Sequence, residues 1–144
     1  MVDGKGLPLA FHLTPGQRHE STCFETLMNQ LHIPQAQGRP RTRPGCVGAD
    51  KAYSMPRIRS WLRERGIQAV IPQRSDEVER HRGRPLNFDK TAYRHRNVIE
   101  RRVGWLKECR RLGTRYDKLA VSYLAMVKLA CIRSYLPIAF SDRA

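Results

Sequence analysis

The order of three segments between Cys46 and Pro72 constrains the fold of this chain more than any other feature. Cys46–Ala49 and Ala69–Pro72 are short and apolar, as buried strands are. Between them apolar residues recur at helical spacing, and Gly66 is placed to end a helix. Strands that alternate with helices are the mark of α/β proteins, so we predict the α/β fold class.

Further elements precede and follow this unit. Leu7–Leu13 is predicted as a strand, and Glu20–His32 as a helix because its apolar residues recur on one face. Pro34–Pro44 carries three arginines and is predicted as a loop. Residues 73–89 are polar and interrupted by glycine and proline, which predicts a mobile loop. The alternation through the first half predicts a mixed sheet with flanking helices.

Two long helices are predicted in residues 90–137. The first spans Lys90–Leu112 and stops near Gly113, and the second follows Asp117 as its N-cap and ends before Pro137. The second helix is apolar on nearly every face, so we predict a core helix that is buried on several sides. It approaches the length of a membrane span, but the two basic residues within it favour the buried helix.

Charge and cysteine content narrow the class of partner. The 144 residues suit one domain, residues 1–144, and 27 Lys and Arg against 13 Asp and Glu give a formal net charge of +14. A basic, arginine-rich chain favours a nucleic-acid partner over a membrane. The four cysteines form no Cys-x-x-Cys pair, and the first residues lack the apolar stretch of a signal peptide. We therefore expect a cytoplasmic protein with reduced thiols.

One face of the first long helix carries a candidate site. In a continuous α-helix Tyr93, Arg96, Glu100 and Lys107 project within an arc of about 60°. A carboxylate beside an aromatic ring and two cations suits metal-dependent phosphoryl chemistry, because the carboxylate holds a divalent ion and the cations hold phosphates. The alternative is a solvated charged face with i, i+4 pairs.

Asp50 is the second candidate, since it follows a predicted strand directly. A carboxylate at such a strand end can face a crevice beside the sheet, and it can pair with Glu100 as a clamp for Mg²⁺. The alternative is a helix cap, because Asp commonly caps the helix that follows it.

Several motifs resemble, in the same order, those of insertion-sequence-five-like transposases of the DDE type. The similarity covers nearly all of the chain, and ordered agreement is more specific than any single pattern. The motifs are Gly6-Leu7-Pro8-Leu9, Leu13-Thr14-Pro15-Gly16-Gln17 with His19, Ala49-Asp50-Lys51-Ala52-Tyr53, Arg96-Asn97-x-x-Glu100-Arg101, and Arg110-Arg111-Leu112-Gly113-Thr114-Arg115-Tyr116-Asp117-Lys118.

The resemblance implies a ribonuclease-H-like core in which two Asp and one Glu bind two divalent ions, with Mg²⁺ expected. Asp50 corresponds to the second Asp and Glu100 to the Glu. Arg96 and Lys107 would clamp phosphates at the transposon end, and Tyr93 would stack on or orient a distorted nucleotide. The partners implied are DNA and further transposase chains in a multimer. The other candidate DNA-binding residues are Arg101, Arg110, Arg111 and Arg115.

The chain departs from this family at the first catalytic Asp, which lies upstream of Gly6-Leu7-Pro8-Leu9 in the family. Asp3 is the nearest carboxylate, but Val2–Gly6 has the composition of a tight turn. We therefore expect an incomplete ribonuclease-H-like sheet and a product that is inactive alone. Two origins fit this expectation, a second reading frame fused to an upstream one by frameshifting or a decayed remnant.

Two rival functions remain open. One is a non-catalytic DNA-binding regulator that occupies transposon ends or forms mixed multimers, and the missing Asp supports it. The weaker rival is a basic RNA-binding protein, for which no aromatic-rich sheet motif is visible.

Overall fold

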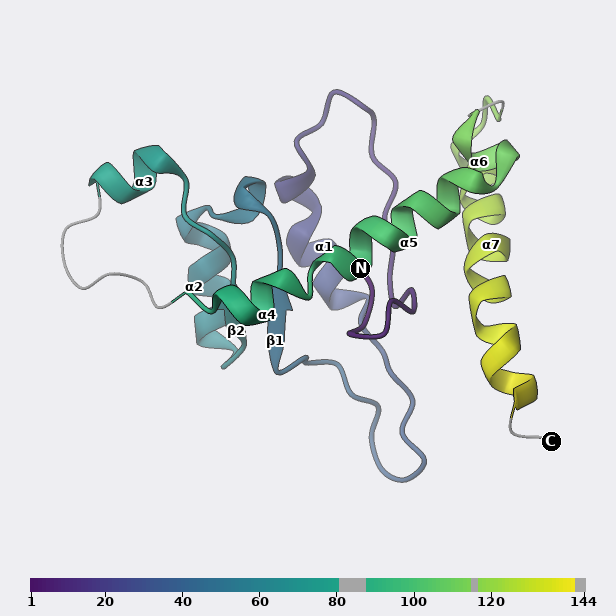
Figure 1. The fold of residues 1–144 in the computed structure, drawn as a ribbon, viewed down its shortest axis with the longest axis horizontal. Coiled ribbons are helices and arrows are strands. Elements are labelled where there is room, and N and C mark those ends of the chain that lie inside the picture. Colours follow the sequence, from purple (N-terminus) through teal and green to yellow (C-terminus); the bar gives the residue numbers. More distant parts are fainter. Residues whose placement is uncertain (81–87, 115–116, 142–144) are drawn as a thin grey trace. The chain divides into compact units, whose positions relative to one another are not determined.

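The computed structural model describes residues 1–80, 88–114 and 117–141 (Figure 1). The chain divides into two compact units, which are taken separately below. One is Gly16–Arg96, and the other combines Met1–Pro15 with Asn97–Ala144.

The unit Gly16–Arg96 contains the predicted strand–helix–strand order. Strand β1 (Cys46–Gly48) pairs in parallel with β2 (Gln68–Val70), with Val47 opposite Ala69. The helix α2 (Pro56–Glu64) lies between them in sequence. The α/β class is therefore confirmed in this part of the chain, whereas the larger ribonuclease-H-like sheet stays a prediction.

The prediction that the first of these strands is buried is wrong. Cys46 and Gly48 are exposed and Val47 is only half-buried. Among the residues that the structure describes, β1 pairs with β2 alone, along one edge. The exposure of Cys46 and Gly48, which point to the same side, shows that little packs on that face. A parallel strand is buried only when helices or strands pack on both of its faces.

The core of this unit lies between α2 and α1 (Phe24–Asn29). The predicted helix over Glu20–His32 is confirmed in a shorter form, because its first turn is the 3-10 helix η1 (Glu20–Cys23). Ile58 and Leu62 of α2 are fully buried, and the ring of Phe24 packs edge-on against Trp61 at a centroid distance of 5.7 Å. Apolar side chains at helical spacing on both helices thus form one core.

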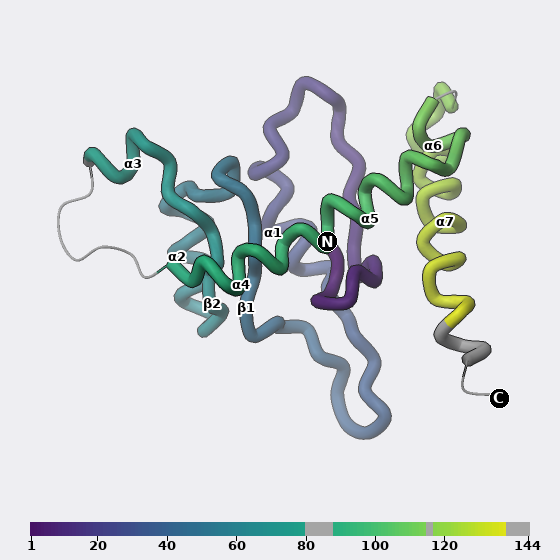
Figure 2. Tube along the Cα trace, viewed as in Figure 1, coloured from purple at the N-terminus to yellow at the C-terminus, as the bar shows by residue number. Residues whose placement is uncertain are grey.

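The predicted loop over residues 73–89 is wrong for its first part, which forms helix α3 (Ser75–Arg80). Two acidic residues in its first turn favour this helix because they face the positive end of the helix dipole. One of them, Glu77, accepts a hydrogen bond of 2.6 Å from the hydroxyl of Ser54. Residues 81–87 of the predicted loop lie outside the described residues. The predicted loop Pro34–Pro44 is confirmed, and Figure 2 traces it between α1 and β1.

The predicted helix Lys90–Leu112 is not continuous. It is divided into α4 (Lys90–Arg94), α5 (Asn97–Glu108) and α6 (Arg110–Gly113). At the first break, the amide of Arg96 donates to the carbonyl of Tyr93, three residues back, which closes the turn more tightly than an α-helix does. At the second break, the backbone of Cys109 is extended, with ψ at 99°.

Helix α7 (Ala120–Ser141) corresponds to the second long helix, with corrections at both ends. Asp117 is not its N-cap, because the first helical hydrogen bond runs from Tyr123 to the carbonyl of Leu119, while Asp117 pairs with Arg111 at 3.4 Å. The helix also runs through Pro137 instead of ending before it. No helix in the described part of the chain is long and apolar enough to span a membrane.

The prediction that this helix is buried on several sides is wrong. Val121 is 79% exposed and Ile132 is 54% exposed, whereas Cys131 is buried. The reason is the small amount of structure around it, since the described elements of its unit are two short helices and the N-terminal segment. These cover one face of α7 and leave the others to solvent.

The predicted strand Leu7–Leu13 is also wrong. Pro8 forms an isolated antiparallel bridge with Val2, and residues 7–13, all of them described, contain no strand. Proline has no N–H for a ladder, and the described residues of this unit supply no neighbouring strand. Instead, the segment is tied down by side chains, since Arg102 donates from Nε to the carbonyl of Gly6 (2.6 Å) and the hydroxyl of Tyr135 donates to the carbonyl of Pro8.

Candidate functional site

Asp50 lies directly after β1 and caps the short 3-10 helix η2 (Lys51–Tyr53). Its Oδ1 accepts a hydrogen bond of 3.0 Å from the amide of Ala52, and its backbone is extended. The capping alternative is therefore confirmed as a contact. A carboxylate has two oxygens with about four acceptor positions, so capping through Oδ1 is compatible with metal binding through the same group.

A second carboxylate, that of Glu20, lies near Tyr53, the last residue of the 3-10 helix that Asp50 caps. The pKa of Tyr53 is raised to about 12, first by burial of its hydroxyl and then by the charges of Glu20 and Asp50. Glu20 belongs to none of the candidate site residues that the sequence indicates. Its position at the start of a helix is typical of a residue that stabilises the helix, so no sequence signal separated it from that role.

Tyr93 and Arg96 lie next to each other at the end of α4. The guanidinium carbon of Arg96 lies 5.4 Å from the centre of the Tyr93 ring, and this ring also packs against Phe88 at 5.3 Å. Tyr93 therefore packs against neighbouring side chains of its own unit. A guanidinium over an aromatic face is held there by a cation–π interaction.

Glu100 and Lys107 both belong to α5 and are both exposed. Their separation of seven residues places them on one face of this helix, as predicted. Because α4 ends at Arg94 and α5 begins at Asn97, the continuous helix predicted to carry all four residues is wrong.

The candidate metal ligands belong to different units, Asp50 to Gly16–Arg96 and Glu100 to the unit with Asn97–Ala144. Their pairing on one metal ion therefore stays a prediction. Within the described ranges, no group of three or more His, Cys, Asp or Glu side chains is gathered at one place.

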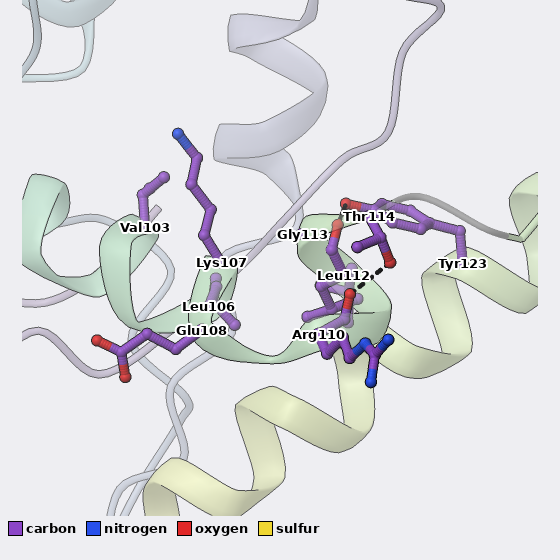
Figure 3. A pocket seen from close by; sticks show the side chains of 10 residues that line it. Val103, Leu106, Lys107, Glu108, Arg110, Leu112, Gly113, Thr114 and Tyr123 are labelled. Carbon is purple, nitrogen blue, oxygen red and sulfur yellow. Dashed lines mark hydrogen bonds between the residues drawn. The ribbon is translucent and has the colours of Figure 1, made fainter.

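The end of α5 is packed against α6 and the start of α7, and Lys107 lies at the rim of this junction (Figure 3). A cavity of 690 Å³ opens there, with Val103, Leu106 and Leu112 among its walls. Thr114 donates from its hydroxyl to the carbonyl of Arg110 at 2.6 Å.

Gly113 is required at this junction. A Cβ atom at this position would lie 2.6 Å from the carbonyl oxygen of Lys107, closer than side chains approach a backbone. The glycine therefore allows α6 to fold back onto the last turn of α5. A side chain at position 113 would collide with the backbone of Lys107.

The basic residues of this unit have two different roles. Arg101, Arg110 and Arg111 are exposed, as a role in DNA binding requires. Arg102 is half-buried and structural, because it bonds Gly6 and donates to the hydroxyl of Ser134 at 3.0 Å. Arg115 lies outside the described residues. The sequence alone does not show which of Arg101 and Arg102 is structural. Only the packing decides which of the two guanidinium groups is bound within the protein.

The sequence is similar to a family of known proteins and to individual proteins of two bacteria. The family described as "Transposase DDE domain" matches residues 1–134. A protein of Burkholderia cepacia, named as a transposase for insertion sequence element IS402, is 34% identical over 91% of this chain, and the chain spans 58% of its length. A protein of Brucella ovis, named as a transposase for insertion sequence element IS6501, is 27% identical over 94% of this chain and 94% of its own length. No solved structure matches the chain significantly.

Proposed function

The chain belongs to the transposase DDE domain family, and on this premise we propose that it serves in DNA transposition as part of a metal-dependent catalytic core. The observation that carries the proposal is the family match over residues 1–134, within which Asp50 and Glu100 stand at the predicted catalytic positions. The core is ribonuclease-H-like and of the insertion-sequence-five-like kind. Residues 1–144 form the C-terminal part of this domain, with residues 90–137 as its closing helices.

Asp50 and Glu100 are the ligands for two Mg²⁺ ions in this proposal. The donor chemistry fits, because carboxylate oxygens are the protein ligands that Mg²⁺ prefers. Bound divalent ions lower the pKa of an attacking water or hydroxyl and neutralise charge on the leaving oxygen. The capping hydrogen bond to Ala52 holds the Asp50 carboxylate in one orientation, which favours such a role.

The basic side chains position the DNA. Arg96 and Lys107 hold phosphate oxygens at the transposon end, and Tyr93 orients a distorted nucleotide there. Arg101, Arg110, Arg111 and Arg115 add contacts to the phosphate backbone. Attack of water cuts a strand and attack of a 3′ hydroxyl joins one, so no bond between protein and DNA forms.

A second function, that of a non-catalytic regulator, is favoured by one observation. Asp3, the only acidic residue before Glu20, is engaged in the N-terminal turn, where its Oδ1 accepts hydrogen bonds from the amides of Lys5 (2.9 Å) and Leu7 (2.8 Å). In this case the chain binds transposon ends and joins multimers with complete transposase chains, and it inhibits them.

A nicking assay on transposon-end duplex in Mg²⁺ separates the two functions. The chain is tested alone and together with a segment that carries the first catalytic Asp. For the enzyme we expect Mg²⁺-dependent nicking in the complemented reaction and its loss, by at least about 100-fold, in Asp50→Asn and Glu100→Gln, because each substitution removes a metal ligand.

Glu108→Gln is the matched control for Glu100→Gln, since Glu108 is exposed on the same helix. It should leave nicking unchanged. Tight DNA binding without nicking under any condition supports the regulator instead, and nicking that survives both ligand substitutions contradicts the proposed metal site.

A further inference from the structure

A shallow pocket of 200 Å³ lies between the N-terminal turn and α5, and its lining contains three cationic side chains. These are Lys5, Arg101 and Arg102, with Gly6, Val98 and Trp105 completing the wall. Lys5 belongs to none of the DNA-binding residues named above. We propose that this pocket binds one phosphate of the DNA backbone, gripped by Lys5 and Arg101 together.

The charge of the pocket supports an anion as its occupant. None of its lining residues is acidic. Two carboxylates are close to the lining residues in sequence: Glu100 directly precedes Arg101, and Asp3 directs Oδ1 at the amides of Lys5 and Leu7. A further guanidinium, that of Arg133, lies 5.9 Å from the centre of the Trp105 ring. Cations gathered in a concave surface attract a phosphate more strongly than the same cations spread over a convex surface do.

The pocket is also held in shape before any ligand arrives. Gly6 has a φ of +87°, which a residue with a side chain rarely adopts, and its amide donates to the carbonyl of Asp3 at 3.1 Å. Arg102 ties this turn to α5 through its hydrogen bond of 2.6 Å to the carbonyl of Gly6. Its guanidinium also lies 5.1 Å from the centre of the Trp105 ring. A fixed arrangement loses little entropy when it binds an anion.

The size of the pocket and its place on α5 favour a phosphodiester of DNA. It is smaller than the roughly 300–1,000 Å³ of pockets for drug-sized ligands, so a phosphate group suits it better than a nucleotide base does. Arg101 directly follows Glu100, the proposed metal ligand. This assignment rests on the proposed function, and it adds a contact that fixes the DNA backbone next to that carboxylate.

The test is the salt dependence of binding to duplex DNA, measured with the whole chain over a series of KCl concentrations. For one phosphate held by both side chains, the slope of log K against log salt should fall in magnitude by about 0.9 in the double variant Lys5→Gln/Arg101→Gln. Each single variant should lower the magnitude of the slope by no more than about 0.9. Lys128→Gln on α7 removes the same charge from an exposed position and should leave the slope unchanged.

Three results would overturn the proposal. They are an unchanged slope in the double variant, a fall of about 1.8 that shows two separate phosphates, and an equal fall in Lys128→Gln. Circular dichroism confirms that each variant is folded.

A titration with inorganic phosphate, followed by amide chemical shifts, separates this inference from the proposed function. Shifts confined to Lys5, Gly6 and Arg101 in a chain that fails to bind duplex DNA support the pocket and reject the proposed function. Duplex binding with an unchanged slope in the double variant rejects the pocket alone.

Discussion

Asp50 combines an observed structural role with a proposed chemical role. Its carboxylate caps η2 through the amide of Ala52, and in the proposed function it is also the second catalytic Asp. A helix cap requires only a short side chain with an acceptor oxygen, whereas a metal ligand also requires the negative charge. The two roles can therefore be separated by substitution.

Replacing Asp50 by Ala and by Asn should separate them. Asp50→Ala should lower the free energy of unfolding by about 1 kcal/mol because the cap is lost, whereas Asp50→Asn should retain it to within a few tenths. Urea denaturation of both variants measures this difference. Equal destabilisation by Ala and Asn would mean that the charge, and not the hydrogen bond, stabilises η2.

Between Lys90 and Gly113, two breaks in the backbone assign the residues of one sequence motif to different helices. A helix that is continuous in the sequence pattern is divided at Arg96 and at Cys109, so the four motif residues are distributed over α4, the break after it and α5. Neither break has a proline, and the return of α6 onto α5 depends on the absence of a side chain at Gly113. The arrangement of Lys107 is therefore decided by local backbone geometry.

Two glycine substitutions of opposite effect test this junction. Gly113→Ala should destabilise the chain by about 1–3 kcal/mol, because the new Cβ overlaps the Lys107 carbonyl. Gly104→Ala, in the exposed middle of α5 where a Cβ meets nothing within 4 Å, should stabilise it by about 0.5–1 kcal/mol. Thermal unfolding of the two variants measures both. A neutral Gly113→Ala would show that α6 does not fold back as described.

The chain as a whole combines a basic surface with exposed apolar side chains on α7. A net charge of +14 favours binding to DNA and opposes association between copies. Val121, Leu129 and Ile132 nevertheless remain more than half exposed. An apolar surface of this kind on an isolated chain promotes aggregation when charge is screened. The solubility of the chain should therefore fall as salt rises.

Replacing two of these side chains should raise solubility without loss of stability. Leu129→Gln/Ile132→Gln is expected to bind less of an apolar dye and to stay soluble at higher salt, while the free energy of unfolding changes by no more than about 0.5 kcal/mol. Ser122→Gln, at an exposed polar position of the same helix, should change neither. A large loss of stability in the double variant would contradict the exposure of α7.

By itself, the sequence determined the local and chemical features. Hydrophobic periodicity predicted α1 and α2, and a short apolar run before Asp50 predicted β1. The composition of Val2–Gly6 predicted a turn, in which Asp3 accepts hydrogen bonds from two amides. Net charge indicated a polyanionic partner, and ordered motifs indicated the transposase family. These features depend on residues close together in the chain or on its total composition.

Only the tertiary structure decided which side chains are buried or hydrogen-bonded within the protein and which are exposed. It divided the long helix at Arg96 and Cys109, exposed the apolar faces of α7, and separated the structural Arg102 from the exposed Arg101. The physical reason is that burial and side-chain hydrogen bonds depend on neighbours that are distant in sequence, and Gly6 and Ser134, both bonded by Arg102, are such neighbours.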